Sequence, residues 1–105
     1  MPSSKEYLEY ILDQLSGLED ISHRKMMGEY IIYYKDKIVG GIYDDRLLVK
    51  PVPAAKRLLP NARFEQPYDG AKEMLLADDP DNKEILAELF ESMLPELPEK
   101  KKKGK

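Results

Sequence analysis

The sequence contains no cysteine, no tryptophan, a single histidine and only two phenylalanines among its 105 residues. The absence of cysteine excludes disulfides, thiolate metal sites and cysteine nucleophiles, and it is compatible with a reducing compartment. The single histidine, His23, would need carboxylate partners to hold zinc, and such a carboxylate-rich donor set is unusual. We therefore assign His23 an ordinary position at the start of a strand, and we expect neither a metal nor a cofactor.

Long apolar runs are also missing from the chain. The opening stretch, MPSSKEYLEY, is polar and charged and lacks the apolar core of a signal peptide. No apolar run approaches the roughly 20 residues that a membrane-spanning helix needs. These features predict a soluble cytoplasmic protein that has no membrane partner.

The sequence shows none of the familiar catalytic motifs. The five serines lie near helix ends or connectors, outside any nucleophile-elbow pattern, and the glycines form neither a P-loop nor a dinucleotide fingerprint. The acidic run at 78–81 does not fit a calcium loop, because Glu84 stands where the sixth position counted from Asp79 requires glycine. Helix capping explains these acids better. We expect a protein that is not an enzyme, while a carboxylate pair stays open among Glu29, Glu65 and Glu73.

The chain does contain a stretch rich in β-branched and aromatic residues, over 24–51, and this stretch predicts three short strands. Asp36 separates the first two strands, and Asp44 with Asp45 separates the last two. Aspartate suits such turns because its short side chain can hydrogen-bond to the local backbone. Two short turns in succession predict an antiparallel meander, since parallel strands need long crossovers.

Alternation along these strands divides their side chains between two faces. We expect the core face to hold Met26, Gly28, Tyr30, Ile32, Ile38, Gly40, Ile42, Leu47 and Val49. The opposite face is unusually apolar for a surface in contact with water, so either the chain itself or a partner covers it. That face supplies the candidate interface, which consists of Met27, Ile31, Tyr33, Val39, Tyr43 and Leu48. The pair Gly40-Gly41 inside a strand indicates a β-bulge, a close backbone approach or a bend without functional meaning.

The segments on either side of the meander predict helices and two further strands. Ser3 precedes Glu6 by three residues, the spacing of a capping box, and apolar residues then recur at helical intervals. Pro53 suits the first turn of a short helix, and acidic residues before Asn82 suit the start of the last helix. The expected order is a helix over about Ser4–Leu15, the three strands, a helix over Ala54–Leu59, strands over Arg63–Glu65 and Lys72–Ala77, and a final helix. The fold class is therefore α+β, with one domain over 1–97 and a disordered lysine-rich tail over 98–105.

The net charge of −3 is unevenly distributed along the chain. Five lysines and two glutamates give residues 95–105 a charge of +3, which leaves −6 for residues 1–94. An acidic body is poorly suited to holding a phosphate backbone, and a lysine tail of this kind is more often solvated than bound. Basic residues nonetheless fall near the second helix and the first strand. They form the candidate anion-binding set, Arg24, Lys25, Lys50, Lys56 and Arg57, for which a solvated face is the alternative interpretation.

Two runs, Arg24-Lys25-Met26-Met27-Gly28-Glu29-Tyr30 and Asp45-Arg46-Leu47-Leu48-Val49-Lys50, resemble the TfoX N-terminal domain family. The resemblance covers about Ser3 to Leu97. It implies an α+β fold of helix, three antiparallel strands, helix, two strands and helix, similar to YgaC-like and secretion-chaperone-like domains. It also implies a non-catalytic role in transcriptional or competence regulation through protein contacts. Full competence regulators carry a second, C-terminal domain, whereas a lysine-rich stretch follows here, so the chain resembles a single-domain member.

Two functional hypotheses follow from these observations. The first is a non-enzymatic interaction domain whose apolar outer face meets a protein partner or a second copy of the chain. The second is a domain that binds nucleic acid or another anion through the basic set, with an affinity that falls steeply as salt rises. A small-molecule enzyme is a distant third reading, and it would need a deep pocket with converging carboxylates.

Overall fold

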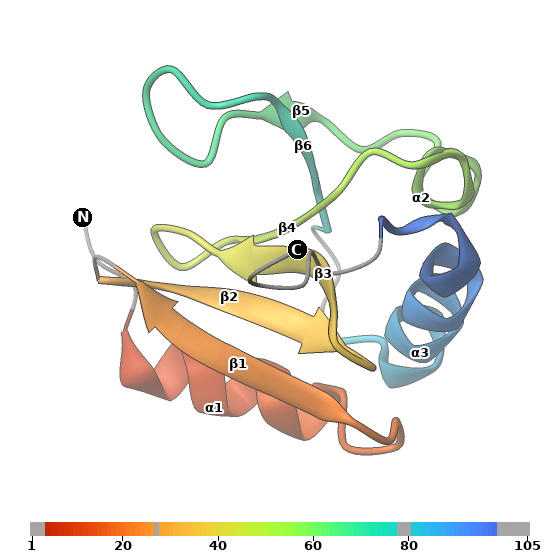
Figure 1. The fold of residues 1–105 in the computed structure, drawn as a ribbon, viewed down its shortest axis with the longest axis horizontal. Helices are drawn as coiled ribbons and strands as arrows, with labels where there is room; N and C mark the ends of the chain where they lie inside the picture. Colours follow the sequence, from red (N-terminus) through yellow and green to blue (C-terminus); the bar gives the residue numbers. More distant parts are fainter. Residues whose placement is uncertain (1–3, 27, 78–80, 99–105) are drawn as a thin grey trace, which may run out of the picture.

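The computed structural model describes residues 4–26, 28–77 and 81–98, which form one sheet and the helices packed against it (Figure 1). The sheet has six strands in the order β1-β2-β3-β4-β6-β5, and every neighbouring pair is antiparallel. The α+β fold class predicted from the sequence is confirmed. The candidate interface residue Met27 and most of the predicted lysine-rich tail lie outside the described residues.

The segment that predicted three strands contains four. The strands of the sheet are β1 (Ile21–Met26), β2 (Glu29–Tyr34), β3 (Lys37–Ile42), β4 (Leu47–Val49), β5 (Phe64–Glu65) and β6 (Met74–Leu76). The prediction of one continuous strand through Gly28 was wrong, because the chain reverses there and Met26 pairs with Glu29. Gly28 has φ +85°, a left-handed conformation that glycine adopts without steric penalty.

The two aspartate turns of the meander are confirmed. Lys35 and Asp36 both have positive φ, 51° and 67°, which is the backbone of a type I′ hairpin turn. Asp44 and Asp45 have φ 55° and 56°, and the backbone groups of the residues that flank them are hydrogen-bonded to each other at 2.9 and 3.0 Å. Aspartate is one of the few residues with a side chain that tolerates this conformation.

A β-bulge changes the facing of β3. Tyr33 pairs with Ile38 and Ile32 pairs with Gly40, so Val39 is an extra residue on β3. Val39 is fully buried in the core, whereas Ile38 is 37% exposed. The prediction that put Ile38 in the core and Val39 on the outer face was therefore wrong, because strict alternation fails where two residues oppose one.

The bulge predicted from the glycine pair is confirmed, and so is a close backbone approach. A Cβ atom on Gly40 would clash with the carbonyl oxygen of Leu48 and would lie 2.7 Å from the Cα atom of Val49. A Cβ atom on Gly41 would lie 2.6 Å from the carbonyl oxygen of Tyr30. The neighbouring strands therefore leave no room for a side chain at either position.

Three α-helices and one short 3-10 helix flank the sheet. They are α1 (Lys5–Gln14), α2 (Pro53–Leu58), α3 (Lys83–Met93) and the 3-10 helix η1 (Leu94–Glu96). The hydroxyl oxygen of Ser4 accepts a hydrogen bond from the backbone N–H of Tyr7 at 3.1 Å, so Ser4 is the N-cap of α1. The N-cap is one residue later than predicted, and Tyr7 stands where a capping box needs Glu or Gln, so the predicted capping box between Ser3 and Glu6 was wrong. Asn82 caps α3 in the same way.

The core lies between one face of the sheet and the helices. Tyr30, Ile32 and Tyr34 of β2 point into it, while the residues that alternate with them are only partly buried. Figure 1 shows α1 below the sheet and α3 at its right, with α2 above α3. The largest fully buried side chains of this core are Phe90, Ile11, Leu15, Ile32, Ile42, Leu47, Leu75, Leu86, Leu89, Met93 and Val39.

The helices leave the opposite face of the sheet uncovered, and this face is called the outer face below. The connection between β5 and β6, residues 66–73, extends from the top of the molecule above this face (Figure 1). Within the three described ranges, no helix is long and apolar enough to cross a membrane.

Candidate functional site

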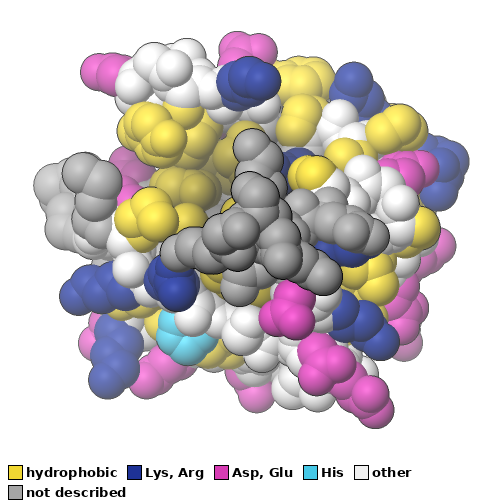
Figure 2. Space-filling model, in the orientation of Figure 1, with side chains coloured by type: hydrophobic (Ala, Val, Ile, Leu, Met, Phe, Trp, Pro, Cys, Tyr) yellow, Lys and Arg dark blue, Asp and Glu magenta, His cyan; other side chains and the backbone are white. Residues whose placement is uncertain are grey.

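The outer face carries an apolar hollow of about 450 Å³ between the β2–β3 hairpin and the β5–β6 connection. It is lined by Met26, Glu29, Ile31, Tyr43 and Tyr68. Hydrophobic side chains gather around a depression at the upper left of Figure 2, which is the side of the molecule from which the β5–β6 connection projects in Figure 1. We call the five residues that line this depression the outer hollow.

Two tyrosines form the wall of the outer hollow. The ring centroids of Tyr43 and Tyr68 lie 6.4 Å apart with a 55° tilt, a geometry typical of interacting aromatic side chains. The ring of Tyr43 also packs over Gly41, where an added Cβ would come within 2.7 Å of its Cε2 atom. The lack of a side chain at Gly41 therefore leaves room for the Tyr43 ring, and Tyr68 is the more exposed of the two tyrosines.

The loop that carries Tyr68 is held in shape by its own hydrogen bonds. The side-chain amide of Gln66 donates to the carbonyl oxygen of Ala71 at 2.9 Å, and the backbone N–H of Ala71 donates to the carbonyl oxygen of Tyr68 at 3.1 Å. Gly70 supplies a positive φ of 85° between them. Tyr68 is consequently presented on a defined turn, although its side chain is 65% exposed.

The hydroxyl of Tyr43 has a raised pKa. Burial is the largest cause, and the neighbouring Tyr68, Glu29 and Tyr33 raise it further because a tyrosinate would be repelled by their negative charge. The hydroxyl is protonated at neutral pH and stays protonated to a higher pH than in the unfolded chain. This suits the recognition of a neutral or apolar partner group.

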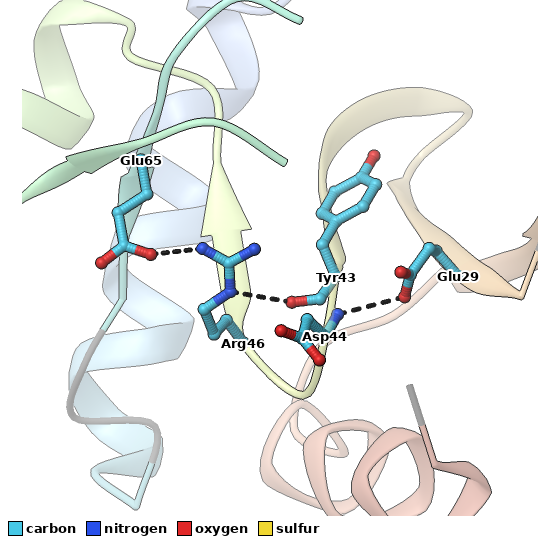
Figure 3. Close-up of polar contacts among 5 residues, drawn as sticks. All are labelled: Glu29, Tyr43, Asp44, Arg46 and Glu65. Atoms are coloured by element: carbon cyan, nitrogen blue, oxygen red, sulfur yellow. Dashed lines mark hydrogen bonds and ion pairs between the residues drawn. The ribbon is translucent and has the colours of Figure 1, made fainter. Parts of the chain in front are cut away.

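A polar frame fixes the turn next to the outer hollow (Figure 3). The guanidinium of Arg46 donates to the Tyr43 carbonyl oxygen at 3.0 Å and forms an ion pair with the Glu65 carboxylate. On the other side of the hairpin, a Glu29 carboxylate oxygen accepts a hydrogen bond from the backbone N–H of Asp44 at 3.1 Å. Glu29 and Glu65 thus lie on opposite sides of the β3–β4 hairpin, so these two carboxylates do not form a pair.

A wider and shallower depression of about 580 Å³ continues from the outer hollow across β3 toward β6. It shares Ile31, Tyr43 and Tyr68 with the outer hollow and adds Ile38, Met74, Lys50 and Lys72, among others. Together the two depressions make a continuous, mainly apolar surface on one side of the sheet.

The structure separates the five candidate interface residues that it describes into three groups. Ile31, Tyr33 and Tyr43 lie partly exposed on the outer face, as predicted. Val39 is in the core, and Leu48 is fully buried although it belongs to the outer face, where it pairs with Gly41 and Leu76. The chain itself therefore covers the β4 part of this face, and the β2–β3 part is the part left accessible.

Sequence reasoning missed Met26 and Tyr68 as members of the surface. Met26 was assigned to the core face, but the reversal at Gly28 places it at the end of β1, where it is 47% exposed. Tyr68 lies in a turn-rich segment whose approach to Tyr43 is a long-range contact. The sequence around it indicated only that an aromatic residue stands between Pro67 and Asp69, in a segment expected to form a turn.

The candidate anion-binding residues are not brought together. Arg24 and Lys25 lie on β1 at the edge of the sheet, whereas Lys50 follows β4 and Lys56 and Arg57 lie on α2. Three strand spacings separate β1 from β4, a distance of about 14 Å across the sheet. The expected single basic patch is therefore two separate groups of cations.

His23 lies on β1 with an exposed side chain, in a T-shaped contact with Tyr30 at 6.1 Å between ring centroids. Among the described residues, no group of three or more histidine or carboxylate side chains is placed to hold a metal ion.

Comparisons with known proteins show which family the chain resembles. The family model described as the TfoX N-terminal domain matches residues 13–89, a span that includes β1 to β6 and most of α3. An uncharacterized 12.7 kDa protein in the trpE 5' region of Spirochaeta aurantia is 34% identical over 79 residues, which cover 75% of this chain and 69% of that protein. No match was found among solved structures.

Proposed function

Because the chain belongs to the TfoX N-terminal domain family, we propose that it is a non-enzymatic protein-interaction domain in a regulatory system of the transcriptional or competence type. Its partner is another protein, and the site of contact is the outer hollow with the depression that continues from it. Nucleic acid is not the ligand we propose, because the separated cations on an acidic body do not form a track for a phosphate backbone.

The observation that carries this proposal is the exposure of large apolar side chains around one concave surface. Met26 and Tyr68 are 47% and 65% exposed, and Ile38 is 37% exposed on the same side of the sheet. Concentrated apolar surface of this kind marks interaction sites on soluble proteins. Tyrosine and methionine are also enriched at protein interfaces, where a hydroxyl or a flexible thioether adapts to the partner.

The polar groups beside the hollow support a binding role rather than a catalytic one. Arg46 is engaged by Glu65 and by a backbone carbonyl, and Glu29 accepts a backbone hydrogen bond. Each of these groups fixes the surface in place, so that a partner meets a preformed shape and loses less entropy on binding.

A photo-crosslinking experiment with a matched pair of variants tests the proposal. A crosslinking amino acid at the exposed Tyr68 position captures the partner in native host cells, and the purified partner is then titrated against the wild-type protein. Ile38→Glu introduces a charge on the outer face, and Ile85→Glu makes the same change at an isoleucine of similar exposure, 40% against 37%, on α3. We expect Ile38→Glu to weaken binding about tenfold or more, which corresponds to the loss of one buried apolar contact.

Ile85→Glu should leave binding unchanged, and it should also preserve the fold because glutamate suits the first turn of a helix. Equal affinity for the wild type and Ile38→Glu, or equal losses in both variants, would count against the outer face as the site of contact.

A further inference from the structure

The strand β1 has a free edge. It pairs with β2 on one side, and among the described residues no strand pairs with it on the other. Every residue of β1 after Ile21 is exposed, so neither face of this strand is covered by a helix. An edge of this kind presents unpaired backbone N–H and C=O groups, which form a ready template for another strand.

The free edge of β1 carries positive charge on both faces. Arg24 pairs with Ile31 and lies on the outer face, whereas His23 and Lys25 pair with Ile32 and Tyr30 on the helix side. The strand contains no acidic residue, although residues 1–94 together carry a charge of −6. β1 is therefore a basic strip at the edge of an otherwise acidic body.

A second copy of the chain is a poor occupant of this edge. Antiparallel pairing about the centre of the strand would place Arg24 of one copy opposite His23 of the other and diagonally across from its Lys25. A shift by one residue would instead place Arg24 opposite Arg24. Like charges directly opposite one another destabilise a strand pair, and charged edge strands are a known device against self-association.

We infer that β1 accepts an extended acidic segment of the partner protein as a seventh strand of the sheet. The backbone of the segment supplies the hydrogen bonds, and its carboxylates lie beside Arg24 on one face and beside His23 and Lys25 on the other. This inference names the chemistry of the partner segment and rests on the proposed interaction function.

The position of Met26 connects this edge with the outer hollow. Met26 is the last residue of β1 and also lines the hollow, so a segment paired along β1 reaches the hollow at that end. A large apolar residue at the corresponding end of the acidic segment would pack against Met26, at the rim of the outer hollow. The segment is therefore a run of acidic residues with an apolar anchor at one end.

Fluorescence anisotropy with three synthetic peptides tests this inference. The first is a labelled peptide of valine and glutamate with a terminal tyrosine, the second replaces each glutamate with lysine, and the third is the acidic peptide with alternate backbone amides methylated. We expect the wild-type protein to bind the acidic peptide and to bind the lysine and methylated peptides at least about tenfold more weakly, because charge and backbone pairing are both required.

Two charge-reversed double variants separate local recognition from the overall charge. Arg24→Glu with Lys25→Glu should lose the acidic peptide and gain the lysine peptide, and this gain shows that the variant is folded. Lys56→Glu with Arg57→Glu makes the same change in net charge on exposed residues of α2 and should keep the wild-type preference.

Several results would overturn the inference. Equal losses in the two double variants would show that only net charge matters, and undiminished binding of the methylated peptide would show that no strand is added. The wild-type protein could also bind single-stranded RNA or DNA more tightly than the acidic peptide. If that binding also depends on Arg24 and Lys25, the free edge of β1 is a binding site for the nucleic-acid backbone and not for an acidic protein segment. None of these variants alters Ile38 or Tyr43. The inference about β1 can therefore be contradicted while the proposed role of the outer hollow is supported, and the opposite result is also possible.

Discussion

Tyr43 combines several features of the outer face in one side chain. Its ring lies on Gly41, its carbonyl oxygen is held by Arg46, and its hydroxyl has a pKa raised mainly by burial. A smaller side chain at position 43, or a bulkier one at position 41, would disturb the packing of these two residues. The residue therefore links the shape of the outer hollow to the stability of the β3–β4 hairpin.

The raised pKa of Tyr43 predicts a loss of stability at alkaline pH. The folded-state pKa of Tyr43 lies above the ordinary tyrosine value of 10.0, so the unfolded chain releases this proton at a lower pH. The contribution of this group to the free energy of unfolding is fully present below pH 10 and is lost as pH rises through the folded-state value. Tyr43→Phe should reduce this alkaline loss, as measured by urea unfolding at a series of pH values.

Tyr7, whose pKa is raised by burial and by Asp45 and Asp81, adds a second contribution of the same sign. An alkaline loss that is identical in wild type and Tyr43→Phe would contradict the assignment.

At the scale of elements, contacts distant in sequence hold the ends of the helices. α2 begins at Pro53 without a side-chain cap from Val52, and its Ala54 N–H instead donates to a Glu96 carboxylate oxygen of η1 at 2.7 Å. The N-cap of α1 is similarly tied to the β3–β4 turn, where Asp45 accepts a hydrogen bond from the Ser4 N–H at 2.8 Å. Both carboxylates lie near helix N-termini, where negative charge is favourable.

Removal of the Glu96 carboxylate should destabilise the protein by about 1 kcal/mol, the usual cost of a lost N-terminal cap. Glu96→Gln keeps a hydrogen-bond acceptor but loses the charge, so its cost should be about half as large. Urea denaturation of Glu96→Ala and Glu96→Gln measures both values. Glu91→Ala, at an exposed position of α3, is the control. A Glu96→Ala protein as stable as this control would show that the cap contributes nothing.

The elements themselves were largely predictable from local chemistry. The turns at Asp36 and Asp44, the proline start of α2 and the apolar periodicity of α1 and α3 each depend on a few neighbouring residues. The two failures in the sheet also have local causes. A glycine can continue a strand or reverse it, so the sequence did not reveal the hairpin at Gly28, and the bulge reversed the predicted facing of Ile38 and Val39.

The candidate site was less predictable because long-range contacts assemble it. The apolar character of the outer face and three of its residues, Ile31, Tyr33 and Tyr43, could be read from alternation along the strands. The approach of Tyr68 to Tyr43 and the burial of Leu48 depend on where the β5–β6 hairpin joins the sheet. No local pattern specifies that β6 lies beside β4, with the short β5 at the edge.

At the scale of the whole molecule, the helices lie apart from the two surfaces proposed for binding, which are the outer hollow and the free edge of β1. The helices cover one face of the sheet, the β5–β6 connection rises above the other, and no strand among the described residues pairs with the outer edge of β1 (Figure 1). Apolar surface is concentrated in the outer hollow, while positive charge lies along the neighbouring edge. A partner that combines an apolar anchor with acidic residues would use both surfaces at once, and such combined use gives both affinity and specificity.

The most direct test of the outer hollow as the site of contact is an NMR titration of the isotopically labelled protein with the crosslinked partner. We predict that the largest shift changes fall on Met26, Ile31, Tyr43 and Tyr68, and that the amides on the exposed side of α3 around Ile85 remain unchanged. Changes centred on α2 and α3, with the signals of the outer hollow unaffected at saturation, would contradict the account.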